Sequence, residues 1–153
     1  MELKNCKVLA VDHETTTLDA VCEHLRGSGA VVMRARSAGE ALMTVVGTTP
    51  DVVLVDVDLK GTDGYGLVRG IRALTQNKGG RVPVVTGAPA LLEGDDPQRW
   101  RDSGAQAHLT KPYDPQELRA VLKSLAGRQV ERRHDDGRLP EHVPTDRRLT
   151  AAA

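Results

Sequence analysis

Short apolar runs alternate with stretches of helical period five times along the chain, and this alternation limits the possible folds more than any other feature. An alternation of strands and helices favours a parallel sheet with helices on both of its faces. We therefore predict an α/β, doubly wound domain built around five parallel strands. The predicted strands are Lys7 to Val11, Val31 to Ala35, Asp51 to Val55, Val82 to Val85 and Ala107 to Thr110.

Helix signals lie between these runs, although one interval is interrupted. Ser37 is a capping candidate for the second helix, and Thr16 or Thr17 is suited to cap the first. Proline and glycine break the segment from Ala88 to Ser103, where only a short helix around Trp100 is expected. The longer helices are predicted from Thr16 or Thr17 to Gly27, from Ala38 to Val46, from Gly64 to Leu74, and from Pro115 through Leu118, Val121, Leu122 and Leu125.

Three strand ends carry charged residues. Asp56 closes the run Val52 to Val55 before a glycine-rich turn, Asp12 ends an earlier run, and Lys111 ends a later one. In an open parallel sheet, ligands bind outside the carboxyl ends of the strands, where the strand order reverses. The three residues are therefore expected to converge on one site. Two carboxylates with room for a hard cation suit magnesium, which prefers oxygen ligands and attracts a phosphoryl group.

The composition argues against several classes of protein. The chain has 21 basic and 21 acidic residues and no net charge, so nucleic acid is not an expected partner. It has no long apolar stretch and no signal-peptide pattern, so no membrane contact is expected. Cys6 begins a strand and Cys22 lies on the apolar face of a helix, which argues against a disulfide framework. Reduced thiols favour a cytoplasmic location.

The composition changes near the end of the chain, after Gly127, to arginine, aspartate and proline without apolar periodicity. We predict a folded domain over residues 1–126 and a disordered tail over residues 127–153. These last 27 residues are too few for a helix-turn-helix or a catalytic domain, so we expect no fused output domain.

Four motifs resemble those of a response-regulator receiver (CheY-like) domain. That family has an acidic pair after strand one, an aspartate with an Asp-Gly turn after strand three, a Ser or Thr after strand four and a Lys-Pro after strand five. Here the motifs read VDHE, VDVDLKGTDG, VVTGAP and HLTKPYDPQEL, and the resemblance covers Val8 to Ala126. GGRVP and QAHLTKPYDPQEL look most like receivers attached to hybrid histidine kinases. The resemblance implies a flavodoxin-like (βα)5 fold with strand order 2-1-3-4-5.

The resemblance also implies a function in two-component phosphorelay signalling. Asp56 would accept a phosphoryl group from a histidine kinase or a phosphotransfer protein, assisted by Lys111 and Thr86. Mg²⁺ would be bound by Asp12, Asp56 and Asp58, the last through its backbone carbonyl. Such a domain is a phosphoacceptor and not an enzyme, with at most self-phosphorylation from small donors and autodephosphorylation.

The output of such a domain is a conformational change at its surface. Thr86 and His108 would act as switch residues for the face made by the fourth helix, the fifth strand and the fifth helix. A downstream effector protein, or a second copy of the chain in a homodimer, would bind this face. The bond between Lys111 and Pro112 resembles a cis peptide that is common in the family.

His13 departs from the family pattern. Receivers usually carry a carboxylate there that binds magnesium directly, and nitrogen serves this hard ion poorly. A zinc site created by His13 is the least favoured outcome, because clustered partners are lacking. Two other outcomes stay open from the sequence. Asp12 and Glu14 compensate and activity is retained, or the site binds metal weakly and phosphorylation is slow.

Strand four and strand five contain further departures. An alignment without gaps places Ala88 at the position of the family hydroxyl, whereas Thr86 lies thirty residues beyond Asp56, which is the usual interval. We favour Thr86. His108 stands where many receivers have a switching Tyr or Phe, so a smaller polar ring replaces that aromatic side chain.

Two alternative functions compete with the phosphoacceptor. A degenerate pseudo-receiver would bind its partner irrespective of phosphate, and His13 is the best support for it. A phosphatase or phosphotransferase of the haloacid-dehalogenase type is suggested by the sequence Asp56-Val57-Asp58. In those enzymes, however, the Asp-x-Asp motif closes the first strand, whereas here it follows the third.

Overall fold

A single parallel sheet forms the centre of the protein. The structure is a computed structural model that describes residues 2–60, 62–89 and 98–136, with side chains described as far as residue 128. Five strands pair in the order β2-β1-β3-β6-β7, which is the predicted order 2-1-3-4-5 of the major strands. The doubly wound fold is thereby confirmed. The strands are β1 (Lys7–Val11), β2 (Val31–Ala35), β3 (Val52–Asp56), β6 (Val84–Pro89) and β7 (Ala107–Lys111).

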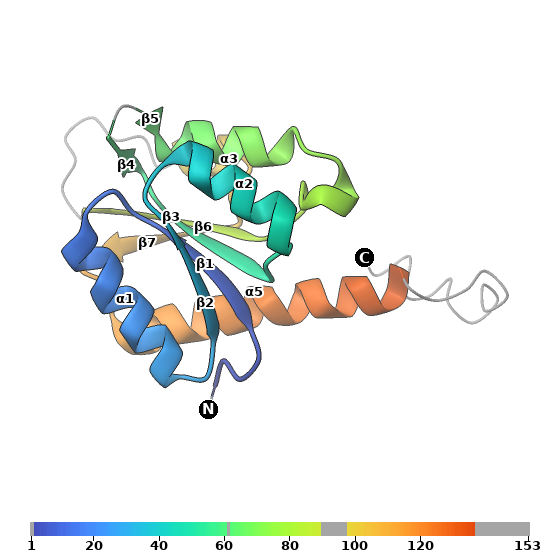
Figure 1. Cartoon of the computed structure of the whole chain (residues 1–153), viewed down its shortest axis with the longest axis horizontal. Helices are drawn as coiled ribbons and strands as arrows, with labels where there is room; N and C mark the ends of the chain where they lie inside the picture. The colour runs from blue at the N-terminus through green and yellow to red at the C-terminus, as the bar shows by residue number, and fades with distance from the viewer. Residues whose placement is uncertain (1, 61, 90–97, 137–153) are drawn as a thin grey trace, which may run out of the picture.

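Helices cover both faces of this sheet (Figure 1). Helices α1 and α5 lie on one face, and α2 and α3 lie on the other. The helices are α1 (Thr15–Gly27), α2 (Ala38–Thr48), α3 (Gly64–Arg72), α4 (Gln98–Asp102) and α5 (Pro115–Asp136). Within the described ranges, none of these helices is long and apolar enough to cross a membrane.

The core is built from Val, Leu, Ile and Ala side chains in two layers. On the α2 and α3 side, Val45 and Ile71 pack against strand residues such as Val53. On the α1 and α5 side, Leu25 and Leu122 pack against the opposite face of the strands. Because no phenylalanine is present, these smaller aliphatic side chains fill the interior at the density that protein cores require.

Helix starts agree with the sequence prediction at α2 and differ at α1. The Ser37 hydroxyl accepts a hydrogen bond of 3.2 Å from the Glu40 amide, so the predicted cap is confirmed. Helix α1 begins at Thr15 behind Glu14, which makes no side-chain cap. The predicted cap by Thr16 or Thr17 is therefore wrong, because both residues lie inside the first turn.

Helix α5 corrects the predicted domain boundary. It begins at Pro115, as its start signal indicates, but continues to Asp136. The prediction of a disordered tail from residue 127 is wrong for residues 127–136, because helical hydrogen bonds carry the backbone past the last apolar turn. Residues 137–153 lie outside the described part of the chain.

Two further elements differ from the sequence prediction. Strand β6 starts two residues later than expected and extends to Pro89, because residues 85–89 pair with β7 along its full length. The turn after Asp56 contains a short antiparallel pair, β4 (Asp58–Leu59) with β5 (Thr62–Asp63). The short helix expected around Trp100 is present as α4, whereas residues 90–97 lie outside the described ranges.

Gly64 lies at the start of α3 in tight contact with the strand end. Its amide donates a 2.7 Å hydrogen bond to the Val57 carbonyl. A Cβ atom at this position would overlap the backbone of Asp56 and Val57. The Asp-Gly turn therefore needs glycine here for close approach of two backbone segments.

Replacing Gly64 with alanine is expected to destabilise the domain by about 1–3 kcal/mol, since the backbone beside Asp56 must shift to accommodate the methyl group. The matched control is Gly47→Ala in α2, where an added Cβ meets no atom within 4 Å. That variant is expected to be unchanged or more stable by up to about 1 kcal/mol, because alanine is the better helix former. Urea unfolding of both variants measures the difference, and equal stabilities would contradict the proposed contact.

Candidate functional site: a buried acidic pair and a lysine

Three strand ends meet at the carboxyl edge of the sheet. Asp12 follows β1, Asp56 ends β3, and both carboxylates are buried because the two strands are neighbours in the sheet. The Nζ atom of Lys111, at the end of β7, lies 2.9 Å from Asp12 Oδ2 and 3.2 Å from Asp56 Oδ2. The structure therefore brings together the three residues that the strand ends singled out.

Backbone amides orient both carboxylates. Asp12 Oδ1 accepts a 2.9 Å hydrogen bond from the Glu14 amide, and Asp56 Oδ1 accepts a 3.2 Å hydrogen bond from the Asp58 amide. Each aspartate thus bonds to the chain two residues further on, as aspartates at turns commonly do. These bonds leave Oδ2 of each carboxylate facing the lysine.

The electrostatics of the site follow from burial and from the neighbouring charges. Burial raises the pKa of Asp56, the Asp58 amide and Lys111 lower it, and the Asp12 charge raises it again, with a net rise above the ordinary value. Burial lowers the pKa of Lys111, but hydrogen bonding and attraction to Asp12 and Asp56 outweigh this and raise it overall. Lys111 therefore stays charged at neutral pH.

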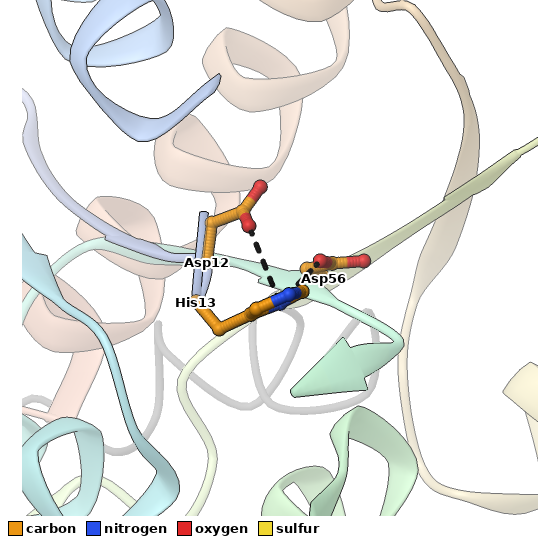
Figure 2. A group of neighbouring side chains, drawn as sticks. All are labelled: Asp12, His13 and Asp56. Atoms are coloured by element: carbon orange, nitrogen blue, oxygen red, sulfur yellow. Dashed lines mark ion pairs between the residues drawn. The ribbon is translucent and has the colours of Figure 1, made fainter. Parts of the chain in front are cut away.

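His13 lies beside the two carboxylates (Figure 2). Its Nδ1 atom is 2.8 Å from the Asp58 carbonyl oxygen, 3.7 Å from Asp56 Oδ2 and 3.9 Å from Asp12 Oδ1. The acidic oxygens and the Asp58 carbonyl are the hard ligands that magnesium prefers, so the residues present fit this ion. The imidazole nitrogen is a further ligand atom of a different kind.

The residues predicted to switch lie on adjacent strands. Thr86 is fully buried on β6, and its hydroxyl is 2.8 Å from His108 Nδ1 on β7. The His108 ring stacks on Trp100 of α4, with centroids 6.0 Å apart and an interplanar angle of 12°. Ala88 packs in a cluster with Val57, Tyr65 and Trp100. In the strand register Gly87 is the partner of Asp56, so Ala88 lies one residue beyond that pair, toward the carboxyl edge, and Thr86 lies one residue before it. The assignment of the family hydroxyl to Thr86 stays a prediction.

Tyr113 contributes to the site in a way that the sequence did not show. A Cβ on Gly87, which pairs with Asp56 across the sheet, would overlap the Tyr113 ring and hydroxyl. Burial, followed by the charges of Asp56 and Asp12, raises the pKa of Tyr113, so its hydroxyl stays protonated. The available signal was its place two residues after Lys111 together with the small residue at position 87. The Lys111–Pro112 bond between them is cis, as the resemblance implied.

With this fold and site, the chain belongs to the response regulator receiver domain family, whose model matches residues 8–123. Domains of this family are phosphoacceptors in two-component signal transduction. Because Asp56 ends the third strand of the sheet and not the first, the position of the Asp-x-Asp motif also argues against the haloacid-dehalogenase alternative.

Curated relatives include larger regulators and one protein of similar length. The transcriptional regulatory protein PrrA of Mycobacterium leprae is 32% identical over 123 residues, which are 80% of this chain and 51% of PrrA. A 14.6 kDa protein of Leptolyngbya boryana is 34% identical over 116 residues, which are 76% of this chain and 86% of that protein. The chain spans about half the length of the PrrA proteins that it matches.

Solved structures give the same result. The receiver domain of the sensor histidine kinase PA1611 of Pseudomonas aeruginosa aligns with a TM-score of 0.72 and 27% identity, covering 80% of this chain and 98% of that one. That structure has a magnesium ion coordinated in its active-site cleft. The chemotaxis response regulator CheY4 of Vibrio cholerae aligns with a TM-score of 0.70 and 26% identity, covering 80% and 99% of the two chains.

The buried Asp56 carboxylate is expected to cost stability at neutral pH when no cation is bound. Because its folded pKa lies above the ordinary value of 3.8, its favourable contribution is present below that value and is lost as the pH rises through the folded pKa. At pH 7, Asp56→Asn should therefore raise the free energy of unfolding by about 1 kcal/mol in metal-free buffer. Urea unfolding measures this difference, which should shrink as the pH falls toward 3.8.

Asp102→Asn serves as the control, since this exposed side chain on α4 has no contact with the acidic pair. Its stability should follow that of the native chain at every pH. A lower stability of Asp56→Asn at pH 7 would show that the ion pair with Lys111 outweighs the burial of the charge.

Proposed function

We propose that Asp56 is the phosphoacceptor of a two-component phosphorelay, which takes its phosphoryl group from a histidine kinase or a phosphotransfer protein. The observation that carries this proposal is the contact of one lysine with two buried carboxylates at the carboxyl edge of the sheet. A charged Lys111 beside Asp56 suits a reaction in which negative charge collects on phosphoryl oxygens.

The proposed step is a displacement at phosphorus. An oxygen of Asp56 forms a bond to phosphorus while the bond from phosphorus to the donor nitrogen breaks, and the electron pair of that bond stays on the donor imidazole. The product is an acyl phosphate, which water later hydrolyses. Lys111 attracts the phosphoryl oxygens, and the Asp58 amide holds the carboxylate of Asp56 in place. Tyr113 limits the space beside Gly87.

Magnesium is proposed to bind at this site, with Asp12, Asp56 and the Asp58 carbonyl as its ligands. When bound, it would neutralise negative charge on the carboxylates and on the phosphoryl oxygens. The donor set of carboxylate and carbonyl oxygens supports this choice. A weakening of magnesium binding by His13 stays a prediction.

We further propose Thr86 and His108 as the switch residues. Phosphate on Asp56 would offer the Thr86 hydroxyl a charged acceptor in place of His108, because charge-assisted hydrogen bonds are stronger than neutral ones. The release of His108 would then change its stacking on Trp100. The face made by α4, β7 and α5 would change shape, and an effector protein would read this population shift.

Two further aspects of the proposal concern cellular location and assembly. A cytoplasmic location is supported by Cys6 and Cys22, both unpaired thiols. A homodimer through the face made by α4, β7 and α5 stays a prediction.

A degenerate receiver is the second candidate, and one observation favours it. The Nδ1 atom of His13 lies within hydrogen-bonding distance of the Asp58 carbonyl, one of the proposed ligands of the cation. If the ring keeps that carbonyl occupied, the domain would bind its partner without phosphorylation. The phosphorylation assay below separates the two candidates.

Incubation with a small phosphodonor and magnesium is expected to add one phosphoryl group to the native chain. Intact-mass measurement should show no adduct on Asp56→Asn, because the amide is no longer a nucleophile. The exposed control Asp102→Asn should be phosphorylated like the native chain. A native chain that stays unmodified with saturating Mg²⁺, with saturating Mn²⁺ and with saturating Ni²⁺ would overturn the phosphoacceptor and favour the degenerate receiver.

Trp100 is the only tryptophan, so its fluorescence reports directly on the proposed switch. Phosphorylation should change its emission, and Thr86→Val should reduce that change to less than about half of the native value, because the hydroxyl that contacts His108 is lost. Thr44→Val, at a partly exposed position of α2 where the hydroxyl donates to the Glu40 carbonyl, is the control. An unchanged response in Thr86→Val, at equal phosphorylation by mass, would exclude Thr86 from the switch.

A further inference from the structure

The His13 imidazole lies at ligand distance from the oxygens of the site. Asp12, His13 and Asp56 each offer one ligand atom, and these atoms lie within 4.8 Å of one another. The His13 Nδ1 atom is also 2.8 Å from the Asp58 carbonyl oxygen. Two atoms bound to one first-row cation at about 2.1 Å lie roughly 3 to 4 Å apart. The spacing therefore needs little rearrangement to hold a cation, and Figure 2 shows the ring directed toward both carboxylates.

We propose that this site binds a first-row transition-metal dication, from manganese to zinc, in preference to magnesium, with His13 Nδ1 as a direct ligand. This inference rests on the proposed function, since it names the class of cation for the same site. Asp12, Asp56 and the Asp58 carbonyl supply the oxygen ligands, and the imidazole supplies the nitrogen.

The chemistry of the donor set carries this preference. Imidazole suits iron, nickel, copper and zinc, and the affinity of a given nitrogen and oxygen site for divalent cations rises from manganese to copper. Magnesium gains little from a nitrogen donor, since it binds through carboxylates and keeps several waters. A chain with His13 therefore loses one ligand for magnesium and gains one for the other cations.

The charge of the site also favours a transition-metal ion over magnesium. The charges of Asp12 and Asp56 are partly balanced by Lys111, which contacts both, and a neutral imidazole adds no further negative charge. Magnesium binding depends strongly on the number of anionic oxygens, because desolvation of this small ion is costly. A transition-metal ion offsets part of its desolvation cost through its bond to nitrogen.

The position of His13 allows this bond to form. The side chain keeps 34% of its surface exposed, so the ring has room to turn toward a cation between the carboxylates. In the structure, Nδ1 donates its proton to the Asp58 carbonyl, because a carbonyl oxygen only accepts. On metal binding, the neutral ring carries its proton on Nε2, so that the Nδ1 lone pair and the carbonyl oxygen both face the cation.

Calorimetric titration of the full chain with Mg²⁺, Mn²⁺ and Ni²⁺ tests the preference. The ratio of Ni²⁺ to Mg²⁺ affinity is expected to be at least about tenfold higher in the native chain than in His13→Asp, which restores a carboxylate. His24→Gln is the matched control, because His24 lies on α1 and bonds to Arg119 away from the site. Its ratio should equal that of the native chain.

Pulsed electron paramagnetic resonance of bound Mn²⁺ provides a direct test of the ligand. Coupling to a histidine nitrogen should be present in the native chain and in His24→Gln, and absent in His13→Asp. Equal affinity ratios in the native chain and His13→Asp, no nitrogen coupling, or the absence of any bound cation would overturn the proposal.

The two proposals fail in different ways. A phosphoryl adduct on Asp56 without nitrogen coupling would reject the transition-metal preference and retain the phosphoacceptor. Nitrogen coupling from His13 without an adduct under any of the three cations would retain the metal site and reject the phosphoacceptor.

Discussion

The ion pairs between Lys111 and the two buried aspartates hold the functional edge of the sheet together. Lys111 and Asp12 are 99 positions apart in the chain, so this contact exists only when β1, β3 and β7 are in register. Two carboxylates buried side by side repel each other, and removing the lysine would leave their charge uncompensated at a cost of several kcal/mol. The site therefore forms only in this arrangement of strands, and the cost of unpaired buried charge in turn favours this arrangement.

The sequence predicted those features that depend on periodicity and chain order. The five parallel strands, the starts of α2 and α5, and the convergence of Asp12, Asp56 and Lys111 follow from short apolar runs whose ends lie at one edge of a parallel sheet. The strand order was predicted from the resemblance to the receiver family. Features set by three-dimensional contact were not predictable. The hydrogen bond between Thr86 and His108 and the packing of Tyr113 over Gly87 join residues whose spacing in the sequence carries no periodic signal. The length of α5 was not predicted because its last turns carry charged residues and no apolar face. The backbone of these turns still forms helical hydrogen bonds.

A continuous series of contacts leads from the acidic pair to the surface at α4. Gly87, beside Asp56 in the sheet, adjoins Thr86, which bonds to His108, which in turn stacks on Trp100. Helix α4 also reaches back toward the turn after Asp56, since Arg99 lies over the Tyr65 ring and pairs with Asp63 at 3.2 Å. A helix of five residues has little stability of its own, so its position depends on such contacts. We therefore expect changes at either connection to affect the position of α4.

The geometry of the acidic site depends largely on backbone groups. A side chain that differs from the family pattern can therefore change the ligands of the site without changing its shape. The amides of Glu14 and Asp58 orient the two carboxylates, and the Asp58 carbonyl is a main-chain atom. An imidazole at position 13 leaves all of these groups in place while it changes the donor set beside them. Membership in the receiver family thus accounts for the shape of the site, whereas the proposed choice of cation depends on His13, the side chain beside the carboxylates that departs from the family pattern.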